Sequence, residues 1–183
     1  MLHSWLDGEQ AAVIESQALA SLLHRVHSGR LFGWRIALLP ALEQYWQGAD
    51  PRRRTRHWHR QLQQLRSVGE PPVFRLAPLH MDIHAGNLIQ GPAGLRLLDW
   101  EYAGDGDIAL ELASLSLPAE QMAALKAHYA RLCHTDSLQL NAAIKRWVPW
   151  VQILTASWYE RRWHQTGEQQ FIHLAEAAWQ PLR

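Results

Sequence analysis

The sequence has little cysteine, no excess of charge of one sign and no long apolar run, and each of these features excludes a class of protein. A single cysteine, Cys133, cannot form a disulfide within the chain, so nothing requires an oxidising compartment. Basic and acidic residues nearly balance, 18 against 17 in 183 residues, so no overall field draws the chain toward nucleic acid or a membrane surface. No apolar run approaches the length of a membrane span, and the first eight residues lack the regions of a signal peptide. We therefore expect a cytoplasmic protein without nucleic-acid or membrane partners.

Apolar residues are plentiful and recur mostly at helical spacing. Hydrophobic residues make up 48% of the chain, which is enough for a globular domain. The periodicity predicts helices over residues 7–27, 37–47, 54–68, 108–117, 119–133, 138–164 and 168–179. Asp7 is the expected N-cap of the first helix, and Pro149 is expected to kink or divide the sixth.

The middle of the chain has a different pattern. Residues 73–79 look extended, and two short apolar runs, 88–90 and 95–98, surround the turn sequence Gly-Pro-Ala-Gly, which predicts a β-hairpin. Polar loops flank the hairpin on both sides. Because the two ends of a hairpin lie together, Asp82 and Asn87 should approach Asp99. The expected fold is α+β: mostly helical, with a small central β-hairpin.

The side chains in these two loops suit phosphoryl transfer. That reaction needs an oriented hydroxyl nucleophile and a divalent metal that neutralises the phosphate oxygens. An aspartate can accept the hydroxyl proton, while an asparagine oxygen and a second carboxylate are the hard ligands that Mg²⁺ prefers. The spacing His80-x-Asp82-x-x-x-x-Asn87, then a hairpin, then Asp99, supplies these groups in order.

The segments HMDIHAGN and LLDWEYAGDGDIALELA resemble the catalytic and metal-binding loops of the protein-kinase-like fold, in its aminoglycoside phosphotransferase and choline kinase branch. Either motif alone is a weak signal, but the pair spaced around a hairpin is a strong one. The resemblance extends over essentially the whole chain. It implies a small-molecule kinase that uses ATP as co-substrate and Mg²⁺ as cofactor, and the helical C-terminal lobe of that fold.

The resemblance also implies roles for individual residues. Asp82 is similar to the catalytic base of the family, and Asn87 and Asp99 are similar to its metal ligands. Four further residues are expected to support these loops: His80, His84, Asp107 and Glu111. Of these, His80 should orient the catalytic loop, and an acidic residue of the helix after the metal loop often braces that loop in the family.

The particular residues of the motifs imply which alcohol accepts the phosphoryl group. The segment DWEYAGDGDIALELA resembles the choline kinase and thiamine kinase subgroup, and FGWR at 32–35 and the tryptophan-rich stretch 147–163 are similar to bacterial thiamine kinases. This similarity implies phosphorylation of the primary alcohol of thiamine to thiamine monophosphate. Choline, another small alcohol or an aminoglycoside are the alternative acceptors.

Ten tryptophans offer faces for a cationic ring such as the thiazolium of thiamine, each worth about 0.5–2 kcal/mol. The residues expected to bind the substrate are Trp34, Glu101, Asp105 and Trp150. Two simpler interpretations stand beside this one. At least half of the tryptophans on the helical face around Trp150 are expected to pack in the core, and Asp105 also suits a plain turn residue.

One part of the family pattern is not found in the sequence. The family carries an N-terminal lobe with a phosphate-covering loop and a lysine for the nucleotide, whereas this chain has no glycine-rich loop before Asp82. We therefore expect residues 1–8 to be the remnant of a hinge and residues 9–183 to be the C-terminal catalytic and substrate lobe. A second hypothesis follows, that the chain is a non-catalytic substrate-binding lobe.

Two other chemistries fit parts of the sequence. His80, Asp82 and His84 suit a zinc-dependent hydrolase, but that interpretation leaves Asn87 unexplained, together with the segment 99–101. The basic run at 51–60 suits nucleic-acid binding, but the near-zero net charge favours a solvated helix start.

Overall fold

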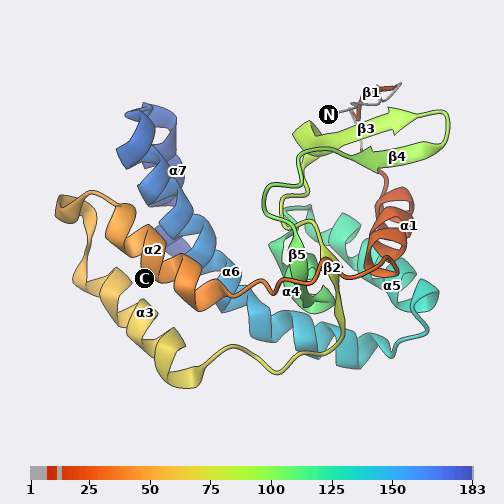
Figure 1. The fold of residues 1–183 in the computed structure, drawn as a ribbon, viewed down its shortest axis with the longest axis horizontal. Coiled ribbons are helices and arrows are strands. Elements are labelled where there is room, and N and C mark those ends of the chain that lie inside the picture. The colour runs from red at the N-terminus through yellow and green to blue at the C-terminus, as the bar shows by residue number, and fades with distance from the viewer. Residues whose placement is uncertain (1–7, 12–13, 183) are drawn as a thin grey trace. The chain divides into compact units, whose positions relative to one another are not determined.

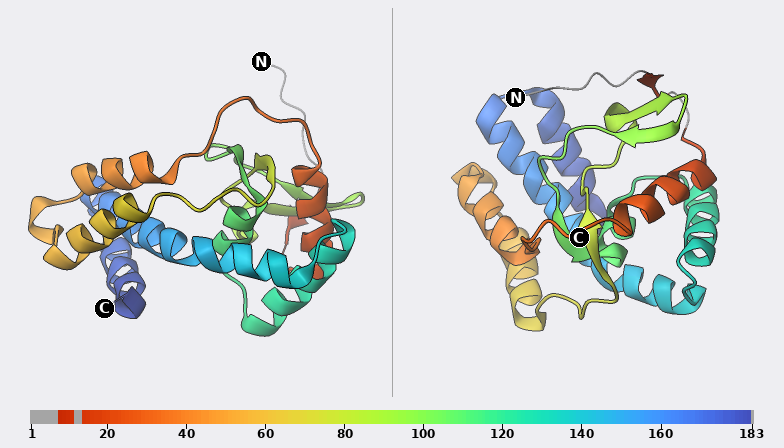
Figure 2. Two further views of the ribbon diagram at one scale, coloured as in Figure 1. Left: turned by 90° about the horizontal axis from the view of Figure 1, so that it is seen from below. Right: turned by 45° about the vertical axis from the view of Figure 1, so that its right-hand side comes forward.

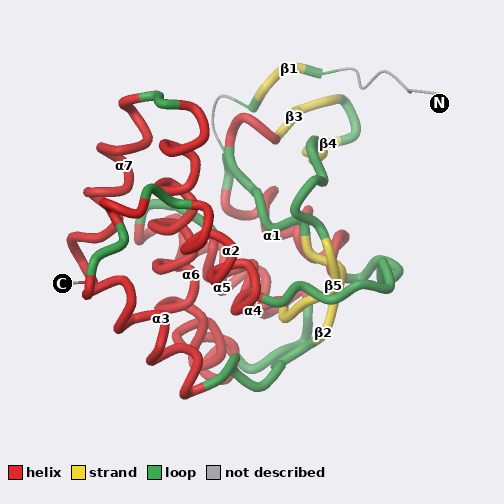
Figure 3. The backbone as a smooth tube through the Cα atoms, turned by 60° about the vertical axis from the view of Figure 1, so that its left-hand side comes forward, coloured by secondary structure: helices red, strands yellow, loops and turns green. Residues whose placement is uncertain are grey.

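In the computed structural model, residues 8–11 and 14–182 are described (Figure 1). They divide into two compact units, one made of the residues up to 36 with 73–145, and the other of 37–72 with the residues from 146. Helices predominate and the strands are short (Figure 3), so the predicted α+β, mostly helical fold is confirmed. Of the predicted hinge remnant, residues 1–7 lie outside the described part of the chain.

The first unit is built on two long helices. Helix α1 (Ser16–His27) packs along α5 (Ala119–Leu132), as the views in Figure 2 show. Its buried residues Leu19, Leu22 and Leu23 share one face at helical spacing. The short α4 (Ile108–Ser114) is almost wholly buried and contacts strand β2.

Two small antiparallel sheets complete this unit. In one, β3 (Leu88–Gly91) and β4 (Gly94–Leu97) form the predicted hairpin, and β1 (Glu9–Gln10) pairs with β3. In the other, β2 (Leu76–Leu79) pairs with β5 (Gly104–Asp107). A short 3₁₀ turn, η2 (Ala85–Asn87), leads directly into β3.

The second unit contains α2 (Leu38–Gly48), η1 (Pro51–Arg53), α3 (Arg56–Val68), α7 (Gln169–Trp179) and η3 (Gln180–Leu182). Helix α6 (Ser137–Thr166) contributes residues to both units. Trp58 is fully buried, and its ring lies 4.9 Å from that of Trp46 and 5.4 Å from that of Trp179, measured between centroids. Aromatic rings therefore form much of the interior of this unit.

Two expectations from the sequence were wrong in detail. The first helix begins at Ser16 and not near Asp7, because residues 9–10 pair as a strand with the open edge of the hairpin; Asp7 itself lies outside the described residues. The polar loop after the hairpin ends in strand β5, which the sequence did not indicate because the strand reads Gly-Asp-Gly-Asp. Of the two expectations for Pro149, division of the helix is excluded because α6 is continuous through it, and a kink stays a prediction.

Strand β5 passes close to a buried side chain of β2. A Cβ atom on Gly106 would lie 2.6 Å from the Leu79 Cδ1 atom, so a larger residue there would require the Leu79 side chain to move.

No helix in the described ranges combines the length and the apolar character that crossing a membrane requires.

Candidate active site

The hairpin brings the two polar loops together at its open end. Leu88 pairs with Leu97 in the strand register, and one step further out the Asn87 carbonyl accepts a hydrogen bond from the Leu98 amide at 2.9 Å. Asn87 therefore lies beside the backbone that leads into Asp99. The expected approach of these two residues follows from the pairing of β3 with β4.

Asn87 also fixes the position of Asp82. Its side-chain nitrogen donates to the backbone carbonyl of Asp82 and to Oδ2 of the Asp82 carboxylate, both at 2.9 Å. Asn87 is 8% exposed, whereas the Asp82 side chain is 35% exposed. The carboxylate is thus held from one side and open to solvent on another. His84 Nε2 lies 3.5 Å from the same carboxylate oxygen, and His84 Nδ1 accepts from the Gly86 amide.

His80 connects the candidate catalytic loop, residues 80–87, to the candidate metal loop, which begins after Leu98. Its side chain is fully buried, and Nδ1 accepts a hydrogen bond from the Asp82 amide at 3.3 Å. Nε2 donates to the Leu98 carbonyl at 2.8 Å. These partners assign the hydrogen to Nε2, and they use both ring nitrogens.

Both loops contain a residue in the left-handed backbone region. Met81 has φ 66° directly before Asp82, and Asp99 has φ 59°. Such a conformation in a non-glycine residue costs on the order of 1–3 kcal/mol and persists only where its surroundings hold it. The two carboxylates are thus aimed by strained backbone.

Glu111 holds the strained turn at Met81. One of its carboxylate oxygens, Oε1, accepts from the His80 amide at 2.7 Å and from the Met81 amide at 2.6 Å, and the residue is fully buried. Glu111 is thereby the acidic residue of α4 that contacts the catalytic loop.

Asp107 has a different set of partners. It caps α4 by accepting from the Ala109 amide at 3.2 Å. It also accepts from the amides of Phe74 and Arg75, the two residues that precede β2. Asp107 therefore secures the start of β2, whereas Glu111 secures the loop that follows the strand.

Asp105 organises the loop that carries Trp34. Its two carboxylate oxygens accept from the amides of Phe32 and Gly33, both at 2.8 Å, while its backbone pairs with Trp34 and Ile36. Asp105 is 3% exposed. Its carboxylate is therefore committed to the fold of this loop.

An exposed strip of aromatic rings extends from this loop to the catalytic loop. The aromatic strip consists of Phe32, Trp34 and Trp100. Phe32 lies 5.1 Å from Trp34 and 6.2 Å from Trp100, and Trp100 meets His80 edge-on at 4.7 Å, all between ring centroids. Trp34 is 57% and Trp100 42% exposed. Glu101 follows Trp100 directly and is exposed as well.

Trp150 is placed differently from the other residues expected to bind substrate. It belongs to the second unit, is 2% exposed, and contacts the ring of Trp147 at 6.3 Å between centroids. These are the features of a core tryptophan, which is the simpler interpretation of its helical face.

The oxygen donors at the hairpin end fit a magnesium ion. With the Asn87 amide nitrogen used twice on Asp82, its Oδ1 atom forms no hydrogen bond to the described residues, and the exposed Asp99 carboxylate likewise has no partner among them. Carboxylate and amide oxygens are the ligand types that Mg²⁺ takes in phosphoryl-transfer sites.

The zinc alternative does not fit these contacts. Both ring nitrogens of His80 are occupied by backbone groups, so His80 is not free to join Asp82 and His84 around a metal. No group of three or more His, Cys, Asp or Glu side chains suited to a metal occurs among residues 8–11 and 14–182.

The basic run at 51–60 is largely engaged within its own unit. Arg52 pairs with Asp50 at 2.7 Å, and Arg53 forms two hydrogen bonds to Glu160 at 2.7 and 2.9 Å. Arg54 donates to the carbonyls of Gln47 and Ala49. The sequence favoured a solvated helix start for this run, whereas the structure pairs Arg52, Arg53 and Arg54 with groups of their own unit.

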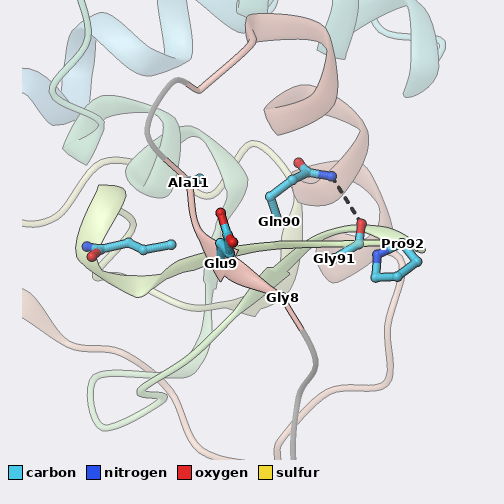
Figure 4. A pocket seen from close by; sticks show the side chains of 7 residues that line it. Gly8, Glu9, Ala11, Gln90, Gly91 and Pro92 are labelled. Atoms are coloured by element: carbon cyan, nitrogen blue, oxygen red, sulfur yellow. Dashed lines mark hydrogen bonds between the residues drawn. The ribbon is translucent and has the colours of Figure 1, made fainter.

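A shallow hollow of about 420 Å³ lies elsewhere in the first unit. Figure 4 shows it between β1 and the turn end of the hairpin, where Gln90 Nε2 donates to the Gly91 carbonyl at 3.2 Å. The turn is the opposite end of the hairpin from Asn87, so this hollow is not part of the candidate active site.

Sequence reasoning did not assign four residues that the structure places in or behind the site: Phe32, Trp100, His27 and Tyr129. Phe32 and Trp100 lie inside the motifs FGWR and DWE, so their place in those motifs could have identified them as site residues. His27 on α1 reaches Glu111, and Tyr129 on α5 reaches His27, and only the packing of those helices reveals these contacts.

The chain is similar to several known proteins in sequence and in fold. A thiamine kinase of Salmonella paratyphi B is 53% identical over 174 residues, which is 94% of this chain and 64% of that protein, so the chain spans about two thirds of its relative's length. An ethanolamine kinase of Plasmodium vivax shares the fold with a TM-score of 0.74 at 15% identity, covering 97% of this chain and 63% of that one. A choline/ethanolamine kinase family protein of Mesorhizobium loti gives a TM-score of 0.73 at 18% identity, covering 91% and 60%. The model of the phosphotransferase enzyme family matches residues 1–147, and the chain therefore belongs to that family.

Proposed function

We propose that the protein catalyses transfer of the γ-phosphoryl group of ATP to the primary alcohol of thiamine, with Mg²⁺ as cofactor. The observation that carries this proposal lies at the open end of the hairpin, where Asn87 is bonded both to Asp82 and to the backbone of Leu98, the residue before Asp99. The identity of 53% to a protein named thiamine kinase supports thiamine as the acceptor.

Asp82 is the proposed base. As the alcohol oxygen of the acceptor bonds to the γ-phosphorus, the bond from that phosphorus to the leaving ADP oxygen breaks, and the hydroxyl proton passes to the Asp82 carboxylate. Asn87 holds this carboxylate by its Oδ2 atom, so that the other oxygen and the exposed edge face the acceptor. Positioning of this kind contributes because the reacting groups no longer have to find one another in solution.

Asn87 Oδ1 and the Asp99 carboxylate are the proposed metal ligands. When bound there, Mg²⁺ supplies positive charge against the phosphate oxygens of ATP. The chain contributes the fixed placement of the two ligands. The backbone pairing of Leu98 with Asn87 sets the position of Asn87. The hydrogen bond from His80 to the Leu98 carbonyl steadies the backbone that leads to Asp99.

The aromatic strip and Glu101 are the proposed binding surface for the cationic acceptor. A thiazolium ring is attracted to a tryptophan face by about 0.5–2 kcal/mol, and Glu101 adds a negative charge beside Trp100. In this proposal Asp105 shapes the loop that presents Trp34 and does not touch the acceptor. Trp150 is assigned to the core and not to the pocket.

The proposal is tested by ATP-dependent formation of thiamine monophosphate in the full-length protein, compared with Asp82→Asn. We expect Asp82→Asn to lose at least about 100-fold in kcat, because general-base catalysis by a positioned side chain contributes that much or more. Thiamine, choline and ethanolamine should be compared as acceptors under the same conditions. Near-normal turnover by Asp82→Asn contradicts the mechanism, and a higher kcat/KM for choline or ethanolamine contradicts the acceptor. Thiamine binding without any transfer by the unsubstituted protein supports the substrate-binding hypothesis instead.

A further inference from the structure

A chain of buried polar groups reaches the catalytic loop from two helices that carry none of the residues proposed to react. His27, in the last turn of α1, has a side chain that is only 3% exposed. Its Nε2 atom lies 2.6 Å from Oε2 of Glu111, and its Nδ1 atom lies 2.6 Å from the hydroxyl of Tyr129 on α5. Tyr129 and Glu111 are both fully buried.

The hydrogen bonds in this chain have one consistent direction. The Glu111 carboxylate accepts, so the imidazole hydrogen is assigned to His27 Nε2, which donates to Glu111 Oε2. With its hydrogen on Nε2, His27 accepts at Nδ1 from the Tyr129 hydroxyl. Burial raises the pKa of Tyr129 far above its usual value, so the hydroxyl retains the hydrogen that it donates. The Tyr129 and His27 rings also meet edge-on, with centroids 5.5 Å apart, which limits rotation of the imidazole.

The other oxygen of Glu111 is the one that holds the catalytic loop. Oε1 accepts from the amides of His80 and Met81, and Met81 is the left-handed residue that precedes Asp82. A carboxylate can hold other groups in place only if its own position is fixed. His27 fixes one oxygen of Glu111, and the second oxygen then meets the two amides at a set place.

From these contacts we propose that His27 and Tyr129 are positioning residues for the catalytic loop. They set the Glu111 carboxylate, which sustains the strained turn at Met81 and thereby aims Asp82. The inference rests on the proposed function for its effect on catalysis, but the arrangement of the loop can be measured without it. A purely structural role, in which these groups only fill space between α1 and α5, makes different predictions.

The test uses substitutions that separate hydrogen bonding from packing. His27→Leu removes both hydrogen bonds at similar volume, whereas His27→Gln keeps a donor for Glu111. Tyr129→Phe removes only the hydroxyl. The matched control is His24→Leu, because His24 lies one turn earlier on α1 and contacts Cys133 Sγ at 3.4 Å instead of Glu111.

We expect His27→Leu to lower kcat by about 10- to 100-fold, since small displacements of catalytic groups have effects of that size. The KM for thiamine of His27→Leu should stay close to that of the unsubstituted protein. His27→Gln should recover much of the kcat, and the kcat of Tyr129→Phe should lie between those of His27→Leu and the unsubstituted protein. Hydrogen exchange at the Met81 amide should be faster in His27→Leu and Tyr129→Phe than in His24→Leu, whether or not thiamine is a substrate.

Two results would overturn the proposal: equal Met81 exchange in His27→Leu and His24→Leu, or an equal kcat in those two variants. If His27→Leu fails to fold, Tyr129→Phe decides by the same two measurements. If the unsubstituted protein transfers no phosphoryl group to thiamine, the proposed function fails while the exchange measurement still judges the positioning role.

Discussion

The side-chain nitrogen of Asn87 lies 2.9 Å from Oδ2 of Asp82, so the proposed base is held by a residue that is itself proposed to bind the metal. One amide group therefore has two tasks, donating to Asp82 with its nitrogen and facing the metal site with its oxygen. Loss of Asn87 should disturb the base and the metal together.

Asn87→Ala is expected to reduce kcat by about 100-fold or more, since both the base and the metal lose a fixed neighbour. It should also raise the Mg²⁺ concentration needed for half-maximal rate. The measurement is initial rate against Mg²⁺ concentration at saturating ATP and thiamine. An unchanged Mg²⁺ dependence would remove Asn87 from the ligand set.

Glu111→Gln should destabilise the protein. The glutamine amide keeps one acceptor oxygen but replaces the other by an NH₂ group. That donor would face another donor, either His27 Nε2 or the amides of the loop. Leaving a buried partner unsatisfied costs about 1–3 kcal/mol, which urea unfolding would resolve. Glu120→Gln, a substitution of the same type at an exposed position in the first turn of α5, is the control and should have little effect. Equal stability of the two variants would contradict the role of Glu111.

Trp34→Ala should raise the KM for thiamine by about 2- to 30-fold with little change in kcat, which corresponds to the loss of 0.5–2 kcal/mol of cation–π attraction. Trp150→Phe is the companion variant. It should lower the melting temperature and leave the KM unchanged, because Trp150 is 2% exposed. A raised KM in Trp150→Phe and none in Trp34→Ala would reverse the two assignments.

The stability of the second unit should depend on pH through Asp50. Hydrogen bonds from the side chain and backbone of Arg52 lower the pKa of Asp50 from 3.8 to about 2. Because the folded pKa is below the unfolded one, this stabilisation is fully present above pH 3.8 and is lost as the pH falls toward 2.

Asp50→Asn should therefore melt at a lower temperature than the unsubstituted protein at neutral pH, and the gap should narrow between pH 3.8 and 2. Melting temperatures of both proteins across pH 2–7 provide the measurement. Arg52→Ala should reproduce part of the loss, because it removes the side-chain bonds to Asp50 while the backbone amide at position 52 still donates. A gap independent of pH would show that the ionised pair is not the source.

The elements of the site were largely predictable, but the way they are held was not. The hairpin could be predicted because its signals are local: two apolar runs around Gly91-Pro92-Ala93-Gly94, with Gly94 at φ 92° completing the turn. Pairing of its strands then brought Asn87 toward Asp99 as a matter of topology.

Strand β5 and the partners of Glu111 depend on contacts between distant segments. Gly104–Asp107 has no apolar alternation and becomes a strand only because β2 lies beside it. Likewise, His27 has no neighbour in sequence that hints at a carboxylate, and it finds Glu111 only after α1 has packed on α5. For Asp105 the sequence allowed both a substrate ligand and a plain turn residue, and only the folded loop shows that its carboxylate accepts from two backbone amides.

The two carboxylates of α4 have a consequence for how this segment can vary. Asp107 holds the amides at the approach to β2, and Glu111, one helical turn later, holds the amides just after the strand. An inserted or deleted residue within β2 would leave one of these carboxylates without its partners. The length of β2 is therefore constrained by hydrogen bonds at both of its ends, in addition to the packing of its buried residues Ala77 and Leu79.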